Sequence, residues 1–488
     1  MKKQDIQKLI CLGLCLVLFA VMSVAVPDFW NWNINYKNNP LDAQIPNQAD
    51  SEVADINFTL PVLYIYSHDI EKLMPFWQWT EDGPVMPLRE ESTVDIYLFD
   101  RESNSVEDIP SRIYYGDMMK LRGRTSSYMQ DKKPFSLEIR DERGQSEDCD
   151  FMGFAPESDF VFHAPFIDRS LVRNFVAYTL QTQITDWAPH CQFAEVFVDT
   201  PGSTLTMEDY QGVYLIVEKI KQDKNRIPMG DYHTPKNMDS FFSEGGNIIW
   251  KRDTYEEGYD TAIRLEKNRY GNGYSVAYPK AEKTNEDAVN AISTEIELLE
   301  KALYEGSDEE FAQYYDVQQI ARVMLLTEFV KNYEGFTSSL FYYRPNGEKV
   351  KAIQWDFDIG TGNVDYRKNL DNAREFSVLT NEKTQPYLAH ENFRTALITQ
   401  WKELRSEGGV FSDENIIALL EDAEAQLDGA WQRNDEKYSY IFEKGTIPYA
   451  NKSNSLENSQ AEREYIKKFL LERGRWLDEH IDSIAELY

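Results

Sequence analysis

The chain has 488 residues, of which 42% are hydrophobic, and a formal net charge of -32 that arises from 83 acidic and 51 basic residues. A chain of this length and hydrophobic content can bury a large core, as one two-lobed unit or as two domains. The strong negative charge repels nucleic acid and anionic membranes over most of the surface, so we expect no nucleic-acid partner. A phosphate ligand would therefore require a local basic cluster or metal ions.

Residues 1–26 have the pattern of an export signal. They begin with three lysines and continue as an apolar run of 18 residues from Leu9 to Val26. This length lies between that of a signal-peptide core and that of a membrane span. Ser23-Val24-Ala25 has the small-x-small pattern of a cleavage site. We predict a signal anchor, with a cleaved signal peptide as the alternative. The positive flank predicts an extracellular domain that contacts the membrane only through this segment, or a secreted protein if the signal is cleaved.

Residues 27–55 are rich in Asn, Pro and Trp, lack periodicity and are predicted to be a linker. Two of the four cysteines lie in the export signal, which leaves Cys149 and Cys191 for the exported part. These two side chains could form one disulfide, or they could be two free buried thiols; their spacing does not decide between the two.

Residues 56–284 are predicted to form a sheet-rich N-terminal lobe. Runs of alternating polarity indicate strands of an antiparallel or mixed sheet. The predicted strands cover residues 60–66, 93–99, 111–115, 135–139, 194–198, 212–217 and 247–251. One helix, over 168–184, interrupts them, and Asp168 or Ser170 is its expected cap.

Residues 285–488 are predicted to form a helix-rich C-terminal lobe, because their apolar residues recur at helical spacing. The expected helices cover residues 292–303, a segment that starts at Ser307, and then 393–405, 413–431 and 462–487. The predicted fold class is therefore α+β, with two lobes and an acidic hairpin in the second.

That hairpin organises the candidate chemistry. An apolar helix ends near Val330, and Glu334 follows in a short loop; strands 340–344 and 349–355 are then joined by a turn that contains Asn346-Gly347. Because a hairpin brings its outer ends together, Glu334 should lie close to Asp356. Protein kinases use the same order of a catalytic acid, a polar metal ligand five residues later, a hairpin and a metal-binding Asp.

Asp356 and Asp358 are candidate ligands of a hard divalent cation such as Mg²⁺ or Mn²⁺. On a continuing strand the two side chains would point the same way. Together they would leave coordination positions of the metal open for phosphate. The alternative is a solvated D-x-D turn, which is common in an acidic protein. Glu334 is either a surface loop residue or a general base for a substrate hydroxyl.

A basic cluster lies at residues 120–133, where five Lys or Arg residues surround Gly123. Arginines next to a glycine and small hydroxyl residues can wrap guanidinium groups and backbone amides around phosphates. We therefore predict nucleotide binding by Arg122, Arg124 and Lys133, against the alternative of a hairpin with exposed charges. Two further residues are assigned to this site: Arg173 as another cation, and Glu218 as the partner that positions Lys133.

Six segments together resemble the CotH (spore-coat protein H) kinase family, and the similarity runs from about Leu60 to the end of the chain. The segments are R-G-R-T-S-S (122–127), K-K-P-F (132–135), D-R-S-L-V-R-N (168–174), Y-Q-G-V-Y-L-I-V-E-K-I (210–220), K-N-Y-E-G-F (331–336) and W-D-F-D-I-G-T-G-N (355–363). The resemblance implies an atypical kinase-like fold and an ATP- and metal-dependent Ser/Thr protein kinase. It implies that Asp356 binds the metal, that Arg122 and Arg124 face the phosphates, and that Lys133 and Glu218 belong to the nucleotide lobe.

The chain departs from the family pattern at the catalytic loop. Glu334 stands where the family usually has Asp, and Ser339, a candidate metal ligand, stands where it has Asn or Ser. Relatives often carry Asn at the position of Asp358. Glu is longer than Asp by one methylene, and a displacement of about 1 Å can lower a rate about 100-fold.

Three hypotheses therefore remain. The first is an exported kinase that transfers the γ-phosphate of ATP to a protein acceptor, either a cell-surface or a spore-coat-like protein. The second is a catalytically degenerate, kinase-fold scaffold or nucleotide-binding protein at the cell surface. The third is a carbohydrate-active enzyme with paired carboxylates, suggested by export and by an aromatic content of 13%.

Overall fold

The computed structural model describes residues 49–486 apart from 76–77, 81–82, 86–88, 124–125, 128–129, 237–240, 254–261, 365–368 and 444–455. The predicted export signal and Arg124 lie outside the described residues. The end of the predicted linker is ordered: helix α2 (Ser51–Ala54) buries Val53, and the amide of Asp50 donates to the carbonyl of Leu205 at 2.9 Å. The folded part therefore begins before residue 56.

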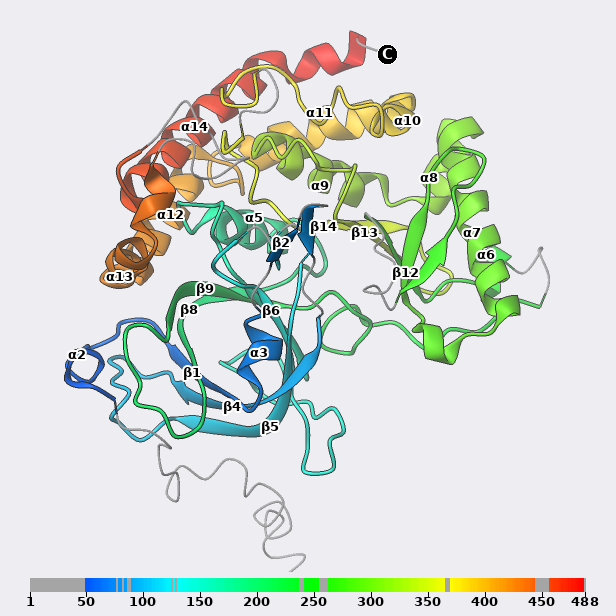
Figure 1. The fold of residues 1–488 in the computed structure, drawn as a ribbon. Coiled ribbons are helices and arrows are strands. Elements are labelled where there is room, and N and C mark those ends of the chain that lie inside the picture. Colours follow the sequence, from blue (N-terminus) through cyan, green and yellow to red (C-terminus); the bar gives the residue numbers. More distant parts are fainter. Residues whose placement is uncertain are drawn as a thin grey trace, which may run out of the picture.

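Seven N-terminal strands close into a barrel (Figure 1). In barrel order they are β1 (Val62–Ser67), β4 (Glu91–Phe99), β5 (Arg112–Leu121), β6 (Phe135–Glu138), β7 (Asp159–His163), β9 (Tyr210–Glu218) and β8 (Cys191–Asp199). All neighbours are antiparallel except β1 and β8, whose parallel pairing closes the barrel. The mixed sheet predicted from the sequence is confirmed, but its closure was not predicted.

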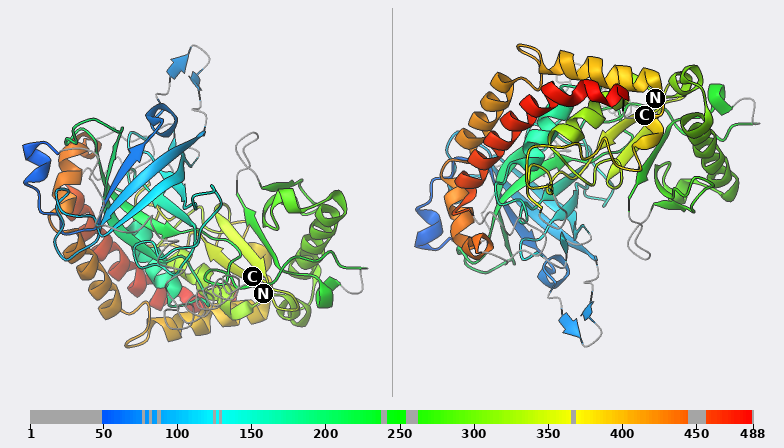
Figure 2. Two further views of the ribbon diagram at one scale, coloured as in Figure 1. Left: turned by 90° about the horizontal axis from the view of Figure 1, so that it is seen from below. Right: turned by 90° about the horizontal axis from the view of Figure 1, so that it is seen from above.

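The barrel interior is filled by alternate apolar residues of its strands, among them Leu63, Ile96, Phe160 and Ile216. Two short strands, β2 (Gln78–Thr80) and β3 (Gly83–Val85), pair with each other outside the barrel and project from it (Figure 2). A short helix, α3 (Ile70–Leu73), lies between β1 and this projection. Every strand predicted before residue 220 is present in the barrel.

A second sheet has five antiparallel strands in the order β11-β12-β10-β13-β14. They are β10 (Ile248–Arg252), β11 (Ile263–Leu265), β12 (Tyr274–Tyr278), β13 (Leu340–Arg344) and β14 (Lys351–Gln354). Because β10 pairs with β13, the sheet takes strands from both sides of the predicted lobe boundary at residue 284. The predicted hairpin at residues 340–355 is confirmed, and it forms one side of this sheet.

The helices lie over one end of the barrel and beside the second sheet (Figure 1). The longer ones are α5 (Arg173–Thr182), α7 (Glu286–Glu305), α8 (Asp308–Tyr314), α9 (Val317–Phe329), α11 (Glu391–Arg405), α12 (Asp413–Leu427), α13 (Ala430–Lys437) and α14 (Ser459–His480). The short ones are α6 (Phe241–Glu244), α10 (Gln385–Leu388), η4 (Ala281–Lys283), η5 (Ser439–Phe442) and η6 (Ile481–Glu486). The helix predicted over 413–431 is split by Gly429, whose φ of 79° ends α12 and begins α13.

Helix α9 is the centre of the largest apolar core. It is buried on nearly all sides, between α5, α11, α14 and β14. Its buried residues are mostly apolar, and they also include Gln319, Thr327 and Glu328. Since α9 leads directly into the loop of Glu334, the base of the candidate site is held by this core.

Cys149 and Cys191 are both free thiols. Cys149 and Cys191 are not joined, so the disulfide alternative is wrong. Burial raises the pKa of Cys149 to about 12. This thiol therefore stays protonated at neutral pH.

The membrane anchor predicted from the sequence lies in residues 1–26, outside the described part of the chain. Within the described residues, we find no helix with both the length and the apolar character needed to cross a bilayer.

An ion pair between α9 and α14 is buried completely. Arg473 contacts Glu328, and both side chains are 0% exposed. Arg473 also donates to the carbonyls of Ala373 and Glu375, at 2.9 and 2.7 Å. The pair therefore joins two helices to the segment that follows residue 368.

Replacing Arg473 by Met should lower the free energy of unfolding by about 3–5 kcal/mol, because it leaves the Glu328 carboxylate buried without its cation. Urea denaturation measures this loss. The matched control is Arg374→Met, which removes an exposed pair with Glu472 and should cost less than about 1 kcal/mol. Equal losses in the two variants would contradict the prediction.

Candidate active site

The hairpin brings Glu334 and Asp356 to the same end of the second sheet. Leu340 pairs with Gln354 at the end of the ladder, and the amide of Trp355 donates to the carbonyl of Ser339 at 2.8 Å. Glu334 lies close enough to Asp356 for its charge to raise the pKa of that carboxyl. The juxtaposition expected from the hairpin is therefore present.

Gln354 ties the loop of Glu334 to the end of β14. Its side-chain oxygen accepts from the amide of Phe336 at 3.1 Å, and its Nε2 donates to the carbonyls of Ser338 and Trp355 at 3.1 and 2.8 Å. Its backbone is held in turn by Gln181 of α5, which donates to the Gln354 carbonyl at 3.0 Å and accepts from its amide at 2.9 Å. The side chain of Gln354 thus bonds to the loop of Glu334, and its backbone bonds to helix α5.

The two aspartates do not point the same way, and the prediction that they share a strand face is wrong. Strand β14 ends at Gln354, and Asp356 has a left-handed φ of 65°. Asp356 is exposed, whereas Asp358 is 8% exposed. Phe357, between them, is buried with its ring 5.7 Å from that of Tyr178.

Asp358 is bound to the barrel and to α5. Its Oδ1 accepts from Asn174 Nδ2 at 2.5 Å and lies 3.1 Å from His163 Nε2. Asn174 also accepts from the amide of Phe357 at 2.9 Å. Burial lowers the pKa of His163, but the neighbouring Asp358 outweighs it and the pKa is raised. One carboxyl oxygen of Asp358 is therefore already used in protein contacts.

Asp356 is the accessible carboxylate of the site. Loss of hydration, followed by repulsion from Asp358, Glu334 and Asp253, raises its pKa to about 7. Because the residue is exposed, solvent screens part of this repulsion. A divalent cation beside Asp356 would relieve the rest, so the donor set fits a metal ion.

No group of three or more His, Cys, Asp or Glu side chains in the described part of the chain is arranged to hold a metal ion. Mg²⁺ in nucleotide sites is bound by one or two carboxylates together with phosphates, and it keeps several waters. The residues present therefore fit a metal bound together with a nucleotide better than a metal held by protein alone. Asp356 is the ligand best placed for it, and Asp358 is the second candidate.

Arg122 faces this carboxylate from the barrel. It follows the last residue of β5, and its guanidinium lies 5.5 Å from the centre of the Trp355 ring. Burial lowers the pKa of Arg122, whereas the negative charge of Asp356 raises it. The two side chains therefore lie close enough for their charges to interact. No carboxylate among the described residues lies within ion-pair distance of this guanidinium. Arg122 is therefore a cation that can meet a phosphate beside Asp356.

Lys133 and Glu218 do not form the predicted pair. Lys133 is 6% exposed, and its Nζ donates to the carbonyls of Ser127 and Gln130 at 3.1 and 2.6 Å. Glu218 is bound by Arg226 at 2.7 Å and by His190 Nδ1 at 2.9 Å. The reason is that Arg226, which follows β9, reaches the buried carboxylate, while the amine of Lys133 bonds to the carbonyls of Ser127 and Gln130.

Arg173, which was predicted to bind nucleotide, is also buried. Its side chain is 1% exposed and pairs with Asp168 at 2.6 Å and with Glu462 of α14 at 3.5 Å. Its Nε donates to Thr361 Oγ1 at 3.0 Å. The predicted cap is wrong: α5 begins after Val172, which makes no side-chain capping bond, although Asp168 accepts from the amide of Arg173 at 2.8 Å. Arg173 therefore holds the loop after Asp358 against α5 and α14.

Ser339 and Glu334 lie on the accessible side of the hairpin. Ser339 is half-buried with a φ of 51°, and Glu334 is exposed. Glu334 lines an open recess of about 750 Å³ together with residues 377–383. Arg122, Asp356, Ser339 and Glu334 are thus arranged around one end of the hairpin, whereas Lys133, Arg173 and Glu218 are held in other contacts.

Sequence reasoning missed the uncharged residues that hold the site. Asn332 is 0% exposed and donates to the carbonyl of Asp356 at 2.8 Å, and its Oδ1 has no partner among the described residues. Asn174, Gln181 and Gln354 were missed as well. Asn174 and Asn332 lie inside two segments of the family pattern, which was the one available signal.

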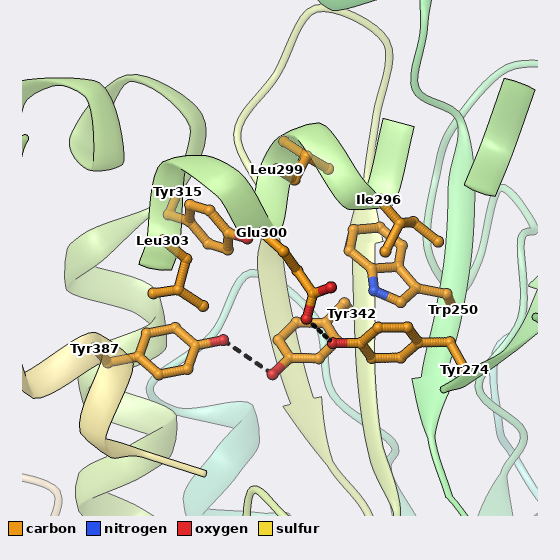
Figure 3. Close-up of a pocket in the computed structure, with 9 residues that line it drawn as sticks. All are labelled: Trp250, Tyr274, Ile296, Leu299, Glu300, Leu303, Tyr315, Tyr342 and Tyr387. Atoms are coloured by element: carbon orange, nitrogen blue, oxygen red, sulfur yellow. Dashed lines mark hydrogen bonds between the residues drawn. The ribbon is translucent and has the colours of Figure 1, made fainter. Parts of the chain in front are cut away.

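A second cavity is lined mainly by aromatic and aliphatic side chains. It has a volume of about 10 Å³ and lies between α7, the second sheet and Tyr387 (Figure 3). Tyr274 donates to Glu300 at 2.6 Å, and the hydroxyls of Tyr342 and Tyr387 are 2.9 Å apart. This volume holds about one water molecule, so no sugar ring fits there.

Comparison with known protein families agrees with this geometry. A model of the family described as CotH kinase protein matches residues 119–477, from β5 to α14. The chain belongs to the CotH kinase family. The match covers most of the chain and includes every candidate site residue named above. Against curated proteins, the chain of this CotH kinase family member has no significant match.

Asp356→Asn should stabilise the folded chain at pH 8 and have little effect below about pH 4. A carboxyl whose folded pKa is raised destabilises the native state above that pKa, and this cost disappears once the group is protonated in both states. Urea denaturation at both pH values measures the difference.

Asp100→Asn, at an exposed position remote from the hairpin, should leave stability unchanged at both pH values. A stabilisation by Asp356→Asn that is the same at pH 8 and pH 4 would show that Asp356 has an ordinary pKa.

Proposed function

We propose that this CotH kinase family member transfers the γ-phosphate of ATP to a Ser or Thr hydroxyl of a protein, with Mg²⁺ or Mn²⁺. Membership of the family supports kinase-like phosphotransfer. The observation that carries the proposal is the approach of Arg122 to Trp355 and Asp356, because it joins a cation of the barrel to the acidic end of the hairpin. Both kinds of group needed around a metal-bound triphosphate are then present.

Asp356, Arg122 and Ser339 each have a role in this reaction. Asp356 would hold the divalent cation, which neutralises charge on the phosphates when bound. Arg122 binds and orients the phosphates from the opposite side. Ser339 offers a hydroxyl beside the same end of the hairpin, but Ser is a weaker metal ligand than Asn.

Glu334 acts on the acceptor. It orients the Ser or Thr hydroxyl and accepts its proton as the acceptor oxygen bonds to the γ-phosphorus and the bond to the β-phosphate oxygen breaks, so that ADP leaves. Its exposure allows an acceptor to approach. Lys133 has no part in this proposal, since its amine is buried and donates to two carbonyls.

A catalytically degenerate scaffold is the second candidate function. Glu334 and Ser339 depart from the family pattern, and the amine of Lys133 is turned toward its own turn rather than toward the site. This candidate predicts nucleotide binding without phosphate transfer. The carbohydrate-active alternative is not proposed, because membership of the CotH kinase family supports phosphotransfer instead.

The acceptor and the location follow from the export signal. We propose that the chain acts outside the cytoplasm, on a cell-surface or spore-coat-like protein, and contacts the membrane only through residues 1–26. The strongly acidic surface supports the absence of a nucleic-acid partner.

Glu334→Gln should lower the rate of phosphate transfer by about 10²–10⁴-fold and leave metal-dependent nucleotide binding unchanged, because it removes the proton acceptor alone. Autophosphorylation and nucleotide binding, measured on the same preparations, separate the two effects. Asp356→Ala should abolish both.

Arg122→Met should weaken nucleotide binding without changing its metal dependence.

If Glu334→Gln retains the parent's transfer rate, Glu334 is not the proton acceptor. If the parent binds nucleotide but transfers no phosphate, the scaffold is the correct function.

A further inference from the structure

The recess beside Glu334 is a separate site that shares only this candidate catalytic residue with the phosphate side. Its volume is about 750 Å³, within the range of ligand-binding sites. Residues 333–338 form one wall and residues 377–383 the other. Arg122, Trp355 and Asp356 are absent from its lining. A molecule in this recess would therefore contact Glu334 without contacting Arg122 or Asp356.

The second wall of the recess is held in place by buried charges. Glu328 accepts from the amides of Ser377 and Leu379, at 2.9 and 2.7 Å. Lys331 donates to the carbonyls of Asn369 and Asn372, at 2.6 and 2.8 Å. Since Glu328 and Lys331 immediately precede the loop of Glu334, the two walls are fixed relative to each other.

The lining of the recess is polar. Hydroxyl groups come from Thr337, Ser338, Ser377 and Thr380, an amide from Asn381, and a second carboxylate beside that of Glu334 from Glu382. Such a surface suits a hydrated polypeptide segment, which offers backbone donors and acceptors, rather than an apolar ligand. The recess therefore has the chemistry expected where the acceptor polypeptide of the proposed reaction would lie.

Lys383 is a preorganised cation in this recess. Its Nζ donates to Asn272 Oδ1 at 3.2 Å, and no carboxylate among the described residues pairs with it. Asn272 is itself held, because it donates to Glu300 at 2.7 Å and to Tyr304 at 3.0 Å. In a chain with a net charge of -32, a lysine held by a neutral amide keeps its charge available for a ligand.

We propose that this recess binds the acceptor polypeptide and that Lys383 contacts an acidic side chain next to the accepting Ser or Thr. The inference rests on the proposed phosphotransfer, since Glu334 connects the recess to that reaction. It adds a substrate class: hydroxyl-bearing segments with a neighbouring carboxylate. Lys383 is a specificity-determining residue in this scheme and has no role in the transfer itself.

The test uses the full chain and a set of labelled Ser peptides that carry Asp, Ala or Lys beside the serine. Fluorescence anisotropy measures binding, and transfer from radiolabelled ATP is measured in parallel. The parent should bind the Asp peptides about tenfold more tightly than the Lys peptides, and salt should reduce this preference. Lys383→Glu should reverse the order, and Lys383→Met should remove it.

The matched control is Lys349→Glu, which makes the same charge change on an exposed residue at the far end of the hairpin. It should leave the order of binding unchanged. Asn272→Ala should weaken the preference for Asp peptides without reversing it, because it releases Lys383 from its neutral partner. Native circular dichroism of each variant confirms that it is folded.

Two outcomes would overturn the inference: an order of binding that Lys383→Glu leaves unchanged, or no binding by any peptide. If the order of peptide affinities depends on Lys383 but no phosphate is transferred, the result would support peptide binding in the recess and overturn the proposed phosphotransfer instead. Transfer to all peptides alike, with no dependence on Lys383, would support the kinase and overturn the inference.

Discussion

The buried amide of Gln354 is the contact on which the geometry of the site depends. It bonds to the loop of Glu334 on one side and to Trp355 on the other, while Gln181 fixes its backbone to α5. These bonds set where the strand ends and where the acidic residues begin. A neutral amide suits this position because it offers both a donor and an acceptor to backbone groups without adding charge beside several carboxylates.

Repulsion between the carboxylates of the site destabilises the fold, and ligand binding can relieve this repulsion. Several carboxylates lie near Asp356, and the barrel contributes Arg122 from the opposite side. Without a ligand, the repulsion between these acids is only partly compensated, and it opposes folding. A metal-bound phosphate would supply positive charge to the acids and negative charge to Arg122 at the same time. Together with the loss of hydration, the same arrangement raises the pKa of Asp356, and it also suits this carboxylate to binding.

Much of the fold could be predicted from periodicity, but closure of the barrel could not. Alternation of polar and apolar residues is the same in an open sheet and in a barrel. The parallel pair of β1 and β8, which closes the barrel, joins segments that are far apart in the sequence. The hairpin at 340–355 was predictable because its turn and both strands are local.

The site was predictable where it depends on the hairpin and not where it depends on buried charge. Glu334 and Asp356 meet because two paired strands bring them together. Nothing in the sequence showed that the amine of Lys133 would bond to nearby carbonyls. Nor did it show that Glu218 would pair with Arg226 instead of Lys133. The left-handed backbone at Asp356 also gives no signal in the sequence, since a non-glycine residue adopts it only when its neighbours impose it.

The pairing of β10 with β13 makes the two halves of the chain depend on each other. A fragment that stopped before residue 285 would leave the hydrogen-bonding groups along β10 open to other molecules, and such bare strands promote aggregation. The complementary fragment would lack the strand on which its hairpin is built. Each fragment expressed alone would therefore be prone to misfold.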